Sequence, residues 1–133
     1  MKYLLDTNVI AIYINGRVLK LRTKLDSTPV DELGVCSIVK AELFTGSLKS
    51  NQAESIRQLQ QALIDRYLSL PFDDHAAEYY ARIRIDLERK GTPIGSNDLM
   101  IAAIAVANDL TLITHNTAEF GRVAGLQHDD WEA

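Results

Sequence analysis

The stretch LMIAAIAVANDLTLIT at residues 99–114 decides the fold class of this chain. Residues 99–107 are uncharged and apolar throughout, so they predict a helix that is buried on all sides. Residues 110–114 follow as a short, mostly apolar strand. A buried helix that leads into a short strand is typical of proteins in which helices cover both faces of a parallel sheet.

The same alternation of short strands and helices continues on both sides of this stretch. Further strands are predicted at residues 2–5 and 33–36, with an edge strand at 69–72 and a last strand near residue 126. Helices are predicted at residues 9–14, 17–25, 37–46, 51–68 and 76–87, and a turn or short helix at 116–120. The expected N-caps are Ser37 and either Ser96 or Asn97, and the expected helix stop is Gly46. We therefore predict one α/β domain over residues 1–133, a three-layer α/β/α sandwich with a central parallel sheet.

The composition is that of an ordinary folded protein and excludes several classes of function. The chain has 133 residues, of which 47% are hydrophobic and 24% charged, so it can bury one sizeable core. Its 14 Lys and Arg against 18 Asp and Glu give a net charge of −4, which argues against nucleic-acid binding through bulk charge. Cys36 is the single cysteine, which excludes an internal disulfide and fits a reducing compartment. We expect a cytoplasmic protein with no membrane partner, because no signal-peptide or membrane-spanning run is found.

Four polar residues lie where the predicted elements would bring them to one edge of the sheet. Asp6 ends the first strand and Asp98 opens the buried helix, while Asn116 follows the strand at 110–114. Glu42 lies about one and a half turns into the helix after the second strand. Ligands of open parallel sheets bind at the carboxyl ends of the strands. Each residue taken alone also fits a helix cap, a turn or a solvated position.

Together, the three acids predict a divalent metal site. If three ionised carboxylates lie ~6 Å apart, each pair costs roughly 3 kcal/mol at an effective dielectric near 20. A divalent cation removes that cost, and oxygen-only ligands favour Mg²⁺, with Mn²⁺ as a substitute, over zinc. Because Mg²⁺ keeps waters free for a nucleophile, the natural substrate of such a site is a phosphate ester.

Four motifs along the chain resemble those of PIN-domain proteins, most closely the VapC toxins of toxin–antitoxin pairs. They are residues 4–8 (LLDTN), residues 41–43 (AEL) with Gly46, residues 95–103 (GSNDLMIAA) and residues 114–120 (THNTAEF). The resemblance implies a parallel sheet sandwiched by helices and a Mg²⁺-dependent endoribonuclease that cuts RNA, commonly tRNA. It also implies a homodimer and a VapB-like antitoxin, which alone would bring the toxin to operator DNA.

The resemblance also assigns roles to individual residues. The family's three acids correspond to Asp6, Glu42 and Asp98, and its fourth site position to Asn116, where many members carry an acid. In the resulting hypothesis Asp6 and Asp98 hold Mg²⁺, and Glu42 orients a water, directly or as a metal ligand. The amide of Asn116 leaves open whether one ion or two are bound. The residues expected to support the site or contact the substrate are Thr7, Asn8, Thr114 and Glu119.

Basic residues near the first helices and on the long helix are candidate phosphate contacts, although solvated surface positions explain them equally well. They are Arg17, Lys20, Arg22 and Lys24, then Arg82, Arg84, Arg89 and Lys90. His115, beside Asn116, is a candidate substrate contact or an incidental loop residue. The residues assigned to the core by default are Ile10, Ile14, Leu59 and Leu63.

Three other functions compete with the ribonuclease hypothesis. A phosphoacceptor receiver domain needs a lysine after a late strand, and no lysine follows Lys90. A DNA-acting nuclease of the wider superfamily is disfavoured by the small size of the chain. A non-catalytic binding module is disfavoured because Asp6, Glu42 and Asp98 are all present.

Overall fold

A five-stranded sheet forms the centre of the computed structural model, which describes residues 1–51 and 53–133. The strands are β1 (Tyr3–Leu5), β2 (Leu33–Cys36), β3 (Leu68–Leu70), β4 (Thr111–Ile113) and β5 (His128–Asp129). Their spatial order is β3-β2-β1-β4-β5, and every neighbouring pair is parallel. Parallel pairing requires a crossover between successive strands, which explains why helices separate them.

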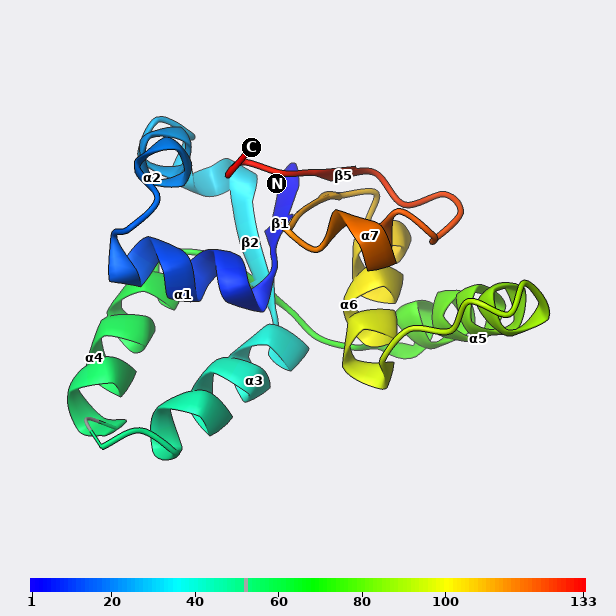
Figure 1. Ribbon diagram of the computed structural model, residues 1–133, viewed down its shortest axis with the longest axis horizontal. Coiled ribbons are helices and arrows are strands. Elements are labelled where there is room, and N and C mark those ends of the chain that lie inside the picture. Colours follow the sequence, from blue (N-terminus) through cyan, green and yellow to red (C-terminus); the bar gives the residue numbers. More distant parts are fainter. Residues whose placement is uncertain (52) are drawn as a thin grey trace.

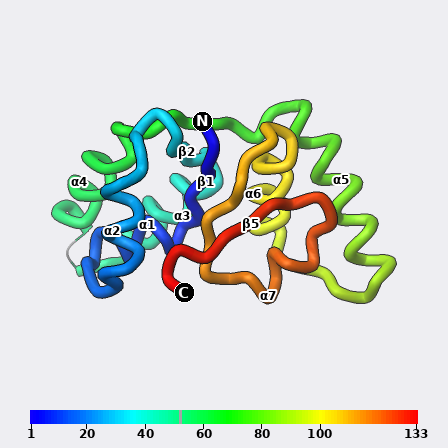
Figure 2. The backbone as a smooth tube through the Cα atoms, turned by 90° about the horizontal axis from the view of Figure 1, so that it is seen from above, coloured from blue at the N-terminus to red at the C-terminus, as the bar shows by residue number. Residues whose placement is uncertain are grey.

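Helices cover both faces of the sheet (Figure 1). They are α1 (Thr7–Asn15), α2 (Leu19–Asp26), the 3₁₀ turn η1 (Val30–Glu32), α3 (Ser37–Leu48), α4 (Ala53–Ile64), α5 (Asp74–Arg89), α6 (Ser96–Ala107) and α7 (Thr117–Phe120). Figure 2 shows α1, α2 and α4 on one side of β1 and β2, and α5 and α6 on the other. The predicted three-layer α/β/α sandwich is confirmed.

The core lies where α6 packs against the sheet. Residues 101–105 of α6 are all fully buried, and so are Leu4, Leu5, Leu112 and Ile113 of the strands β1 and β4. The predicted burial of the whole run at 99–107 is confirmed only in part, because residues 100, 106 and 107 are half-buried. Ile10 and Leu63 are buried as expected, and Ile14 is half-buried against the core. The assignment of Leu59 to the core was wrong, because 57% of this side chain is exposed. It lies on the outer face of α4.

Several predicted helix ends were wrong by one to four residues. Cys36 rather than Ser37 is the N-cap of α3, and Gly95 rather than Ser96 or Asn97 is the N-cap of α6, because both residues have extended backbone. Gly46 does not stop α3, which continues to Leu48. A glycine inside a helix costs only about 1 kcal/mol, and the helix continues through Ser47, which is almost fully buried.

The predicted helix at 51–68 and the strands near its end also needed correction. The helix ends at Ile64, where a turn donates Tyr67 N–H to the Ile64 carbonyl, and the chain then enters β3. The predicted start includes residue 52, which lies outside the described residues. The edge strand begins at Leu68 rather than residue 69 and ends before Pro71, and the last strand pairs at 128–129 rather than near 126. Both shifts follow from pairing with the neighbouring strand.

The order of the strands creates a switch point between β1 and β4. The chain moves outward from β1 through β2 to β3, then crosses the sheet to β4 and moves outward again to β5. The loops after β1 and β4 therefore lead away in opposite directions, which opens a crevice at their carboxyl ends. Within the described residues, no helix combines the length and apolar character needed to cross a membrane.

Candidate active site

Asp6 is fixed at the switch point by neighbours from α1 and from the end of β4. It is the N-cap of α1, and its Oδ1 accepts the Thr7 N–H at 2.8 Å. Its Oδ2 accepts the hydroxyl of Thr114 at 2.8 Å, and its own N–H donates to the Ile113 carbonyl at 3.0 Å. Only 7% of Asp6 is exposed, and Thr114 is fully buried. The carboxylate therefore joins the end of β1 to the end of β4 in one orientation.

Glu42 is held beside Asp6 by residues of two helices. Thr7 donates its hydroxyl to Glu42 Oε1 at 2.7 Å, and Asn97 donates its amide to Oε2 at 3.5 Å. Thr7 therefore contacts Glu42, and its supporting role at the site stays a prediction. The role of Asn97 was missed, because its place before Asp98 suggested only a cap. Asn8 is exposed at the start of α1.

Asp98, Asn116 and Glu119 form the other half of the group. The Asn116 amide donates to Glu119 Oε2 at 2.9 Å, and its N–H donates to Thr114 Oγ1 at 3.0 Å. The carboxyl groups of Asp98 and Glu119 share a hydrogen bond. Glu119 therefore reaches the acids directly, whereas sequence reasoning gave it a supporting place only.

The pKa values of Asp6 and Asp98 show that negative charge at the site is not balanced by neighbouring cations. Burial raises the pKa of Asp6, partly offset by its hydrogen bonds from Thr114 and Thr7. The pKa of Asp98 rises to about 7 because of burial first, then its hydrogen bond to Glu119 and the charges of Asp6, Glu119 and Glu42. The pKa of Glu119 is lowered by the hydrogen bond from Asn116 and then by that from Asp98. Asp98 is thus the proton-holding partner of the pair.

A divalent cation fits this group by its donor chemistry. The donors are carboxylate and amide oxygens, which suit Mg²⁺ or Mn²⁺. The neighbouring carboxylates help to raise the pKa of Asp98 to about 7, and a cation bound there would relieve their repulsion. Cys36, at the end of β2, adds no thiolate ligand, because burial raises its pKa to about 11.

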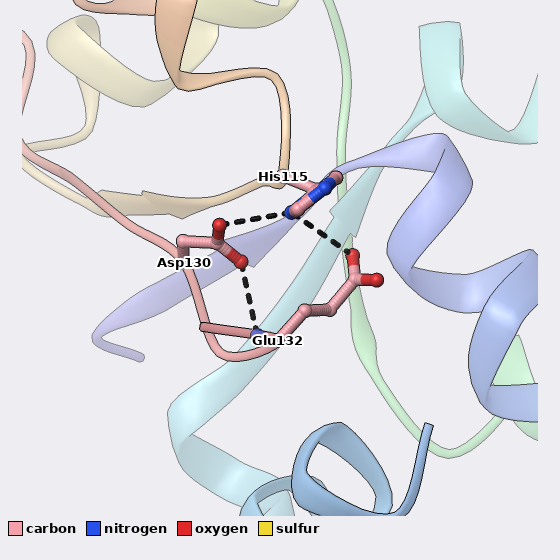
Figure 3. A group of neighbouring side chains, drawn as sticks. All are labelled: His115, Asp130 and Glu132. Carbon is pink, nitrogen blue, oxygen red and sulfur yellow. Dashed lines mark hydrogen bonds and ion pairs between the residues drawn. The ribbon is translucent and has the colours of Figure 1, made fainter. Parts of the chain in front are cut away.

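A second group of titratable side chains lies across the loop that follows β4. His115 Nδ1 is 2.9 Å from Asp130 Oδ2 and 3.9 Å from Glu132 Oε2 (Figure 3). The hydrogen bond to Asp130 and the charges of Glu132 and Asp130 raise the pKa of His115. Sequence reasoning missed this group, because it depends on the pairing of the two-residue strand β5 with β4, which the sequence does not reveal.

Comparison with known proteins agrees with the fold. A family model described as the PIN domain matches residues 3–126. Ribonuclease VapC2 of Rickettsia felis is 35% identical over 133 residues, 99% of each chain. The tRNA(fMet)-specific endonuclease VapC of Shigella flexneri is 33% identical over 131 residues, 98% of each chain.

Solved structures give the same result. The structure of DNA-bound VapBC from Salmonella typhimurium contains a chain that matches with a TM-score of 0.92 and 34% identity over 98% of both chains. The structure of Rickettsia felis VapBC2 bound to a promoter DNA fragment matches with a TM-score of 0.89 and 33% identity, over 98% of this chain and 99% of that one. The chain therefore belongs to the PIN-domain family, in its VapC group.

Proposed function

We propose that this protein is a divalent-metal-dependent endoribonuclease of the VapC type, which hydrolyses phosphodiester bonds of tRNA. The observation that carries the proposal is the hydrogen-bonded group that brings Asp6, Glu42 and Asp98 together at the switch point. The names of the relatives, ribonuclease and tRNA(fMet)-specific endonuclease, support the same reaction class.

Each acid has a distinct part in the proposed reaction. Asp6 and Asp98 would hold Mg²⁺, for which Mn²⁺ could substitute; when bound, the ion would lower the pKa of a water and stabilise charge on the phosphate. Glu42, whose carboxylate is oriented by Thr7 and Asn97, positions the attacking water and accepts its proton. The hydrogen bond from Thr114 lowers the pKa of Asp6 and so partly offsets the effect of burial.

Asn116 and Glu119 act as a pair in this proposal. Asn116 is neutral, but it orients Glu119, whose carboxylate reaches Asp98. Glu119 thereby supplies the fourth acid that Asn116 lacks. We infer that Asn8, which is exposed beside Thr7, contacts the substrate.

A groove beside Glu42 gives the RNA a path to the acids. It has a volume of about 400 Å³ and is lined by Ile38, Ala41, Glu42, Thr45, Gly46, Lys49 and Asn97. Lys49 is exposed at the end of α3 and offers a cation for a backbone phosphate. Because the overall charge is −4, such local cations must offset the repulsion of RNA.

The proposal includes regulation by a partner. We infer that a VapB-like antitoxin binds the protein in the cytoplasm, and that a homodimer of the toxin reaches operator DNA only through that antitoxin. The support is that similar chains occur in VapBC complexes, two of them with DNA.

Cleavage of purified total tRNA, with a single-stranded DNA control, tests the proposal. We expect discrete RNA cuts with Mg²⁺, none with EDTA, and at least about a 100-fold loss in Asp98→Asn. Asp31→Asn is the matched control, because Asp31 is an exposed acid at the opposite, amino end of β2.

Two outcomes overturn the ribonuclease proposal. Cutting of DNA alone would make the protein a DNA-acting PIN nuclease. No cutting of either nucleic acid by folded, Mg²⁺-supplied protein would make it a binding module.

A further inference from the structure

His115, Asp130 and Glu132 bring three ligand atoms together outside the group around Asp6 (Figure 3). One nitrogen or oxygen atom of each residue lies within 4.8 Å of the other two. His115 follows β4, and the two acids follow β5, so the parallel pairing of these strands creates the group. Nothing in the proposed nuclease reaction uses it.

Glu132 is the residue that points to a bound ion. Only 9% of its side chain is exposed, and its Oε2 is buried with no hydrogen-bond partner among the described residues. Figure 3 shows this carboxylate directed at the His115 ring. His115 Nδ1 carries at most one hydrogen, which Asp130 accepts at 2.9 Å, so Glu132 receives no donor from it. A buried carboxylate oxygen without a donor is strongly unfavourable unless a cation faces it.

The spacing of the three atoms suits a small transition-metal ion. Zn²⁺ binds imidazole nitrogen and carboxylate oxygen at about 2.0–2.2 Å, so neighbouring ligands of a tetrahedral site lie about 3.4 Å apart. The two distances from His115 Nδ1, 2.9 and 3.9 Å, lie on either side of this value. An imidazole ligand favours Zn²⁺ and its neighbours over Mg²⁺, which prefers oxygen alone.

The group is also reachable by an ion. The His115 side chain is 64% exposed, while those of Asp130 and Glu132 are 16% and 9% exposed. The two acids are therefore largely buried, and the exposed imidazole lies on the solvent side of the group. Asp130 is further fixed by accepting the Glu132 N–H at 2.9 Å through its other oxygen.

We propose that His115, Asp130 and Glu132 bind a divalent transition-metal ion of the Zn²⁺ class, with water as the fourth ligand. The ion ties the loop after β4 to the segment after β5. That loop also carries Thr114 and Asn116, which contact Asp6 and Glu119. The second site thus stabilises the loop on which the carboxylate group depends.

Calorimetric titration with Zn²⁺ alone tests the proposal, and the readout does not depend on RNA cleavage. The protein used is the full chain carrying Asp98→Asn, which weakens ion binding at the carboxylate group. We expect one Zn²⁺ per chain, not displaced by excess Mg²⁺, and binding weakened more than about tenfold by adding Glu132→Gln or His115→Gln. His75→Gln, which removes an exposed histidine of α5, is the matched control and should leave the affinity unchanged.

A second measurement guards against loss of folding. Circular dichroism of each variant without metal must match that of the parent, and Zn²⁺ at about 100 times its Kd should raise the parent's Tm by about 5–10 °C. At the same Zn²⁺ concentration, this shift should fall to about half or less in Glu132→Gln. The proposal is overturned if the parent binds no Zn²⁺, if folded Glu132→Gln and His115→Gln bind it as tightly as the parent does, or if Mg²⁺ displaces it readily.

Discussion

Replacing Thr114 by valine removes one buried hydroxyl and leaves the shape of the side chain almost unchanged. That hydroxyl donates to Asp6 at 2.8 Å and accepts the Asn116 N–H at 3.0 Å. A hydrogen bond to a charged group contributes about 1.5–3 kcal/mol, and leaving an N–H unpaired costs about 1 kcal/mol more. We expect Thr114→Val to lower the free energy of unfolding by about 2–4 kcal/mol, a large part of the roughly 5–15 kcal/mol of a typical domain.

The free energy of unfolding lost in Thr114→Val should be larger at high pH than at low pH. Burial raises the pKa of Asp6 in the folded protein, and the hydrogen bond from Thr114 limits that rise. Without the hydroxyl the pKa rises further. Between the ordinary pKa of an aspartate and the raised pKa of Asp6, the folded protein keeps a proton that the unfolded chain releases. Its free energy of unfolding therefore falls as the pH rises between these two pKa values. Thr114→Val should therefore cost more above the pKa of Asp6 than below it.

Urea denaturation followed by circular dichroism, at about pH 7.5 and about pH 4, measures both effects. The matched control is Thr111→Val, which changes a half-exposed threonine of β4 whose hydroxyl meets Gln127 at 3.4 Å. We expect this control to change stability by less than about 0.5 kcal/mol. If Thr114→Val costs no more than the control, or costs the same at both pH values, the assigned hydrogen bond to an ionised Asp6 is refuted.

Four further predictions follow from the structure. Phe120→Ala should lower the free energy of unfolding by about 3–5 kcal/mol in urea, because Phe120 is fully buried; a loss below about 1 kcal/mol would contradict its packing. Cys36, fully buried and with a pKa raised to about 11, should resist iodoacetamide at neutral pH until the protein is unfolded, as mass spectrometry would show. The pKa of Asp98, raised from 3.8 to about 7, means that the metal-free folded protein binds a proton that the unfolded chain lacks between these values. Its Tm should therefore fall as the pH rises across this window, Mg²⁺ should restore it more above pH 7 than below, and Asp98→Asn should flatten the profile. Lys49→Ala should reduce the slope of log affinity for RNA against log salt by about one, measured by filter binding with cleavage-deficient protein, and an unchanged slope would remove Lys49 from the RNA path.

The sequence predicted the layers of this fold because its strongest signal is also its most buried element. The run at 99–107 has no polar face, so a central position was the only way to bury it, and the neighbouring strand then required a parallel sheet. Helix ends were predicted less well. Ser37 and Ser96 are good caps by type, but backbone conformation places the cap one residue earlier, at Cys36 and Gly95.

Part of the candidate site could be predicted from the sequence, and part could not. Residues that directly follow strands, such as Asp6 and Thr114, could be placed at the sheet edge from topology alone. The contacts that side chains make across the crevice could not be predicted from topology. Asn97 reaching Glu42, and Glu119 reaching Asp98, depend on how α6 and α7 approach the sheet. The pairing of His115 with Asp130 depends on the register of β5 against β4, which a two-residue strand does not reveal in a sequence.

The side chains joined at the switch point come from distant parts of the chain, since Asp6 and Thr114 are 108 positions apart. On a ribosome, Asp6 emerges among the first residues, and its partner emerges only after most of the protein has been made. A growing chain can therefore assemble the group only after β4 has been made, and a fragment that lacks β4 cannot assemble it. Under the proposed function, the growing chain is therefore harmless to RNA until β4 has been made.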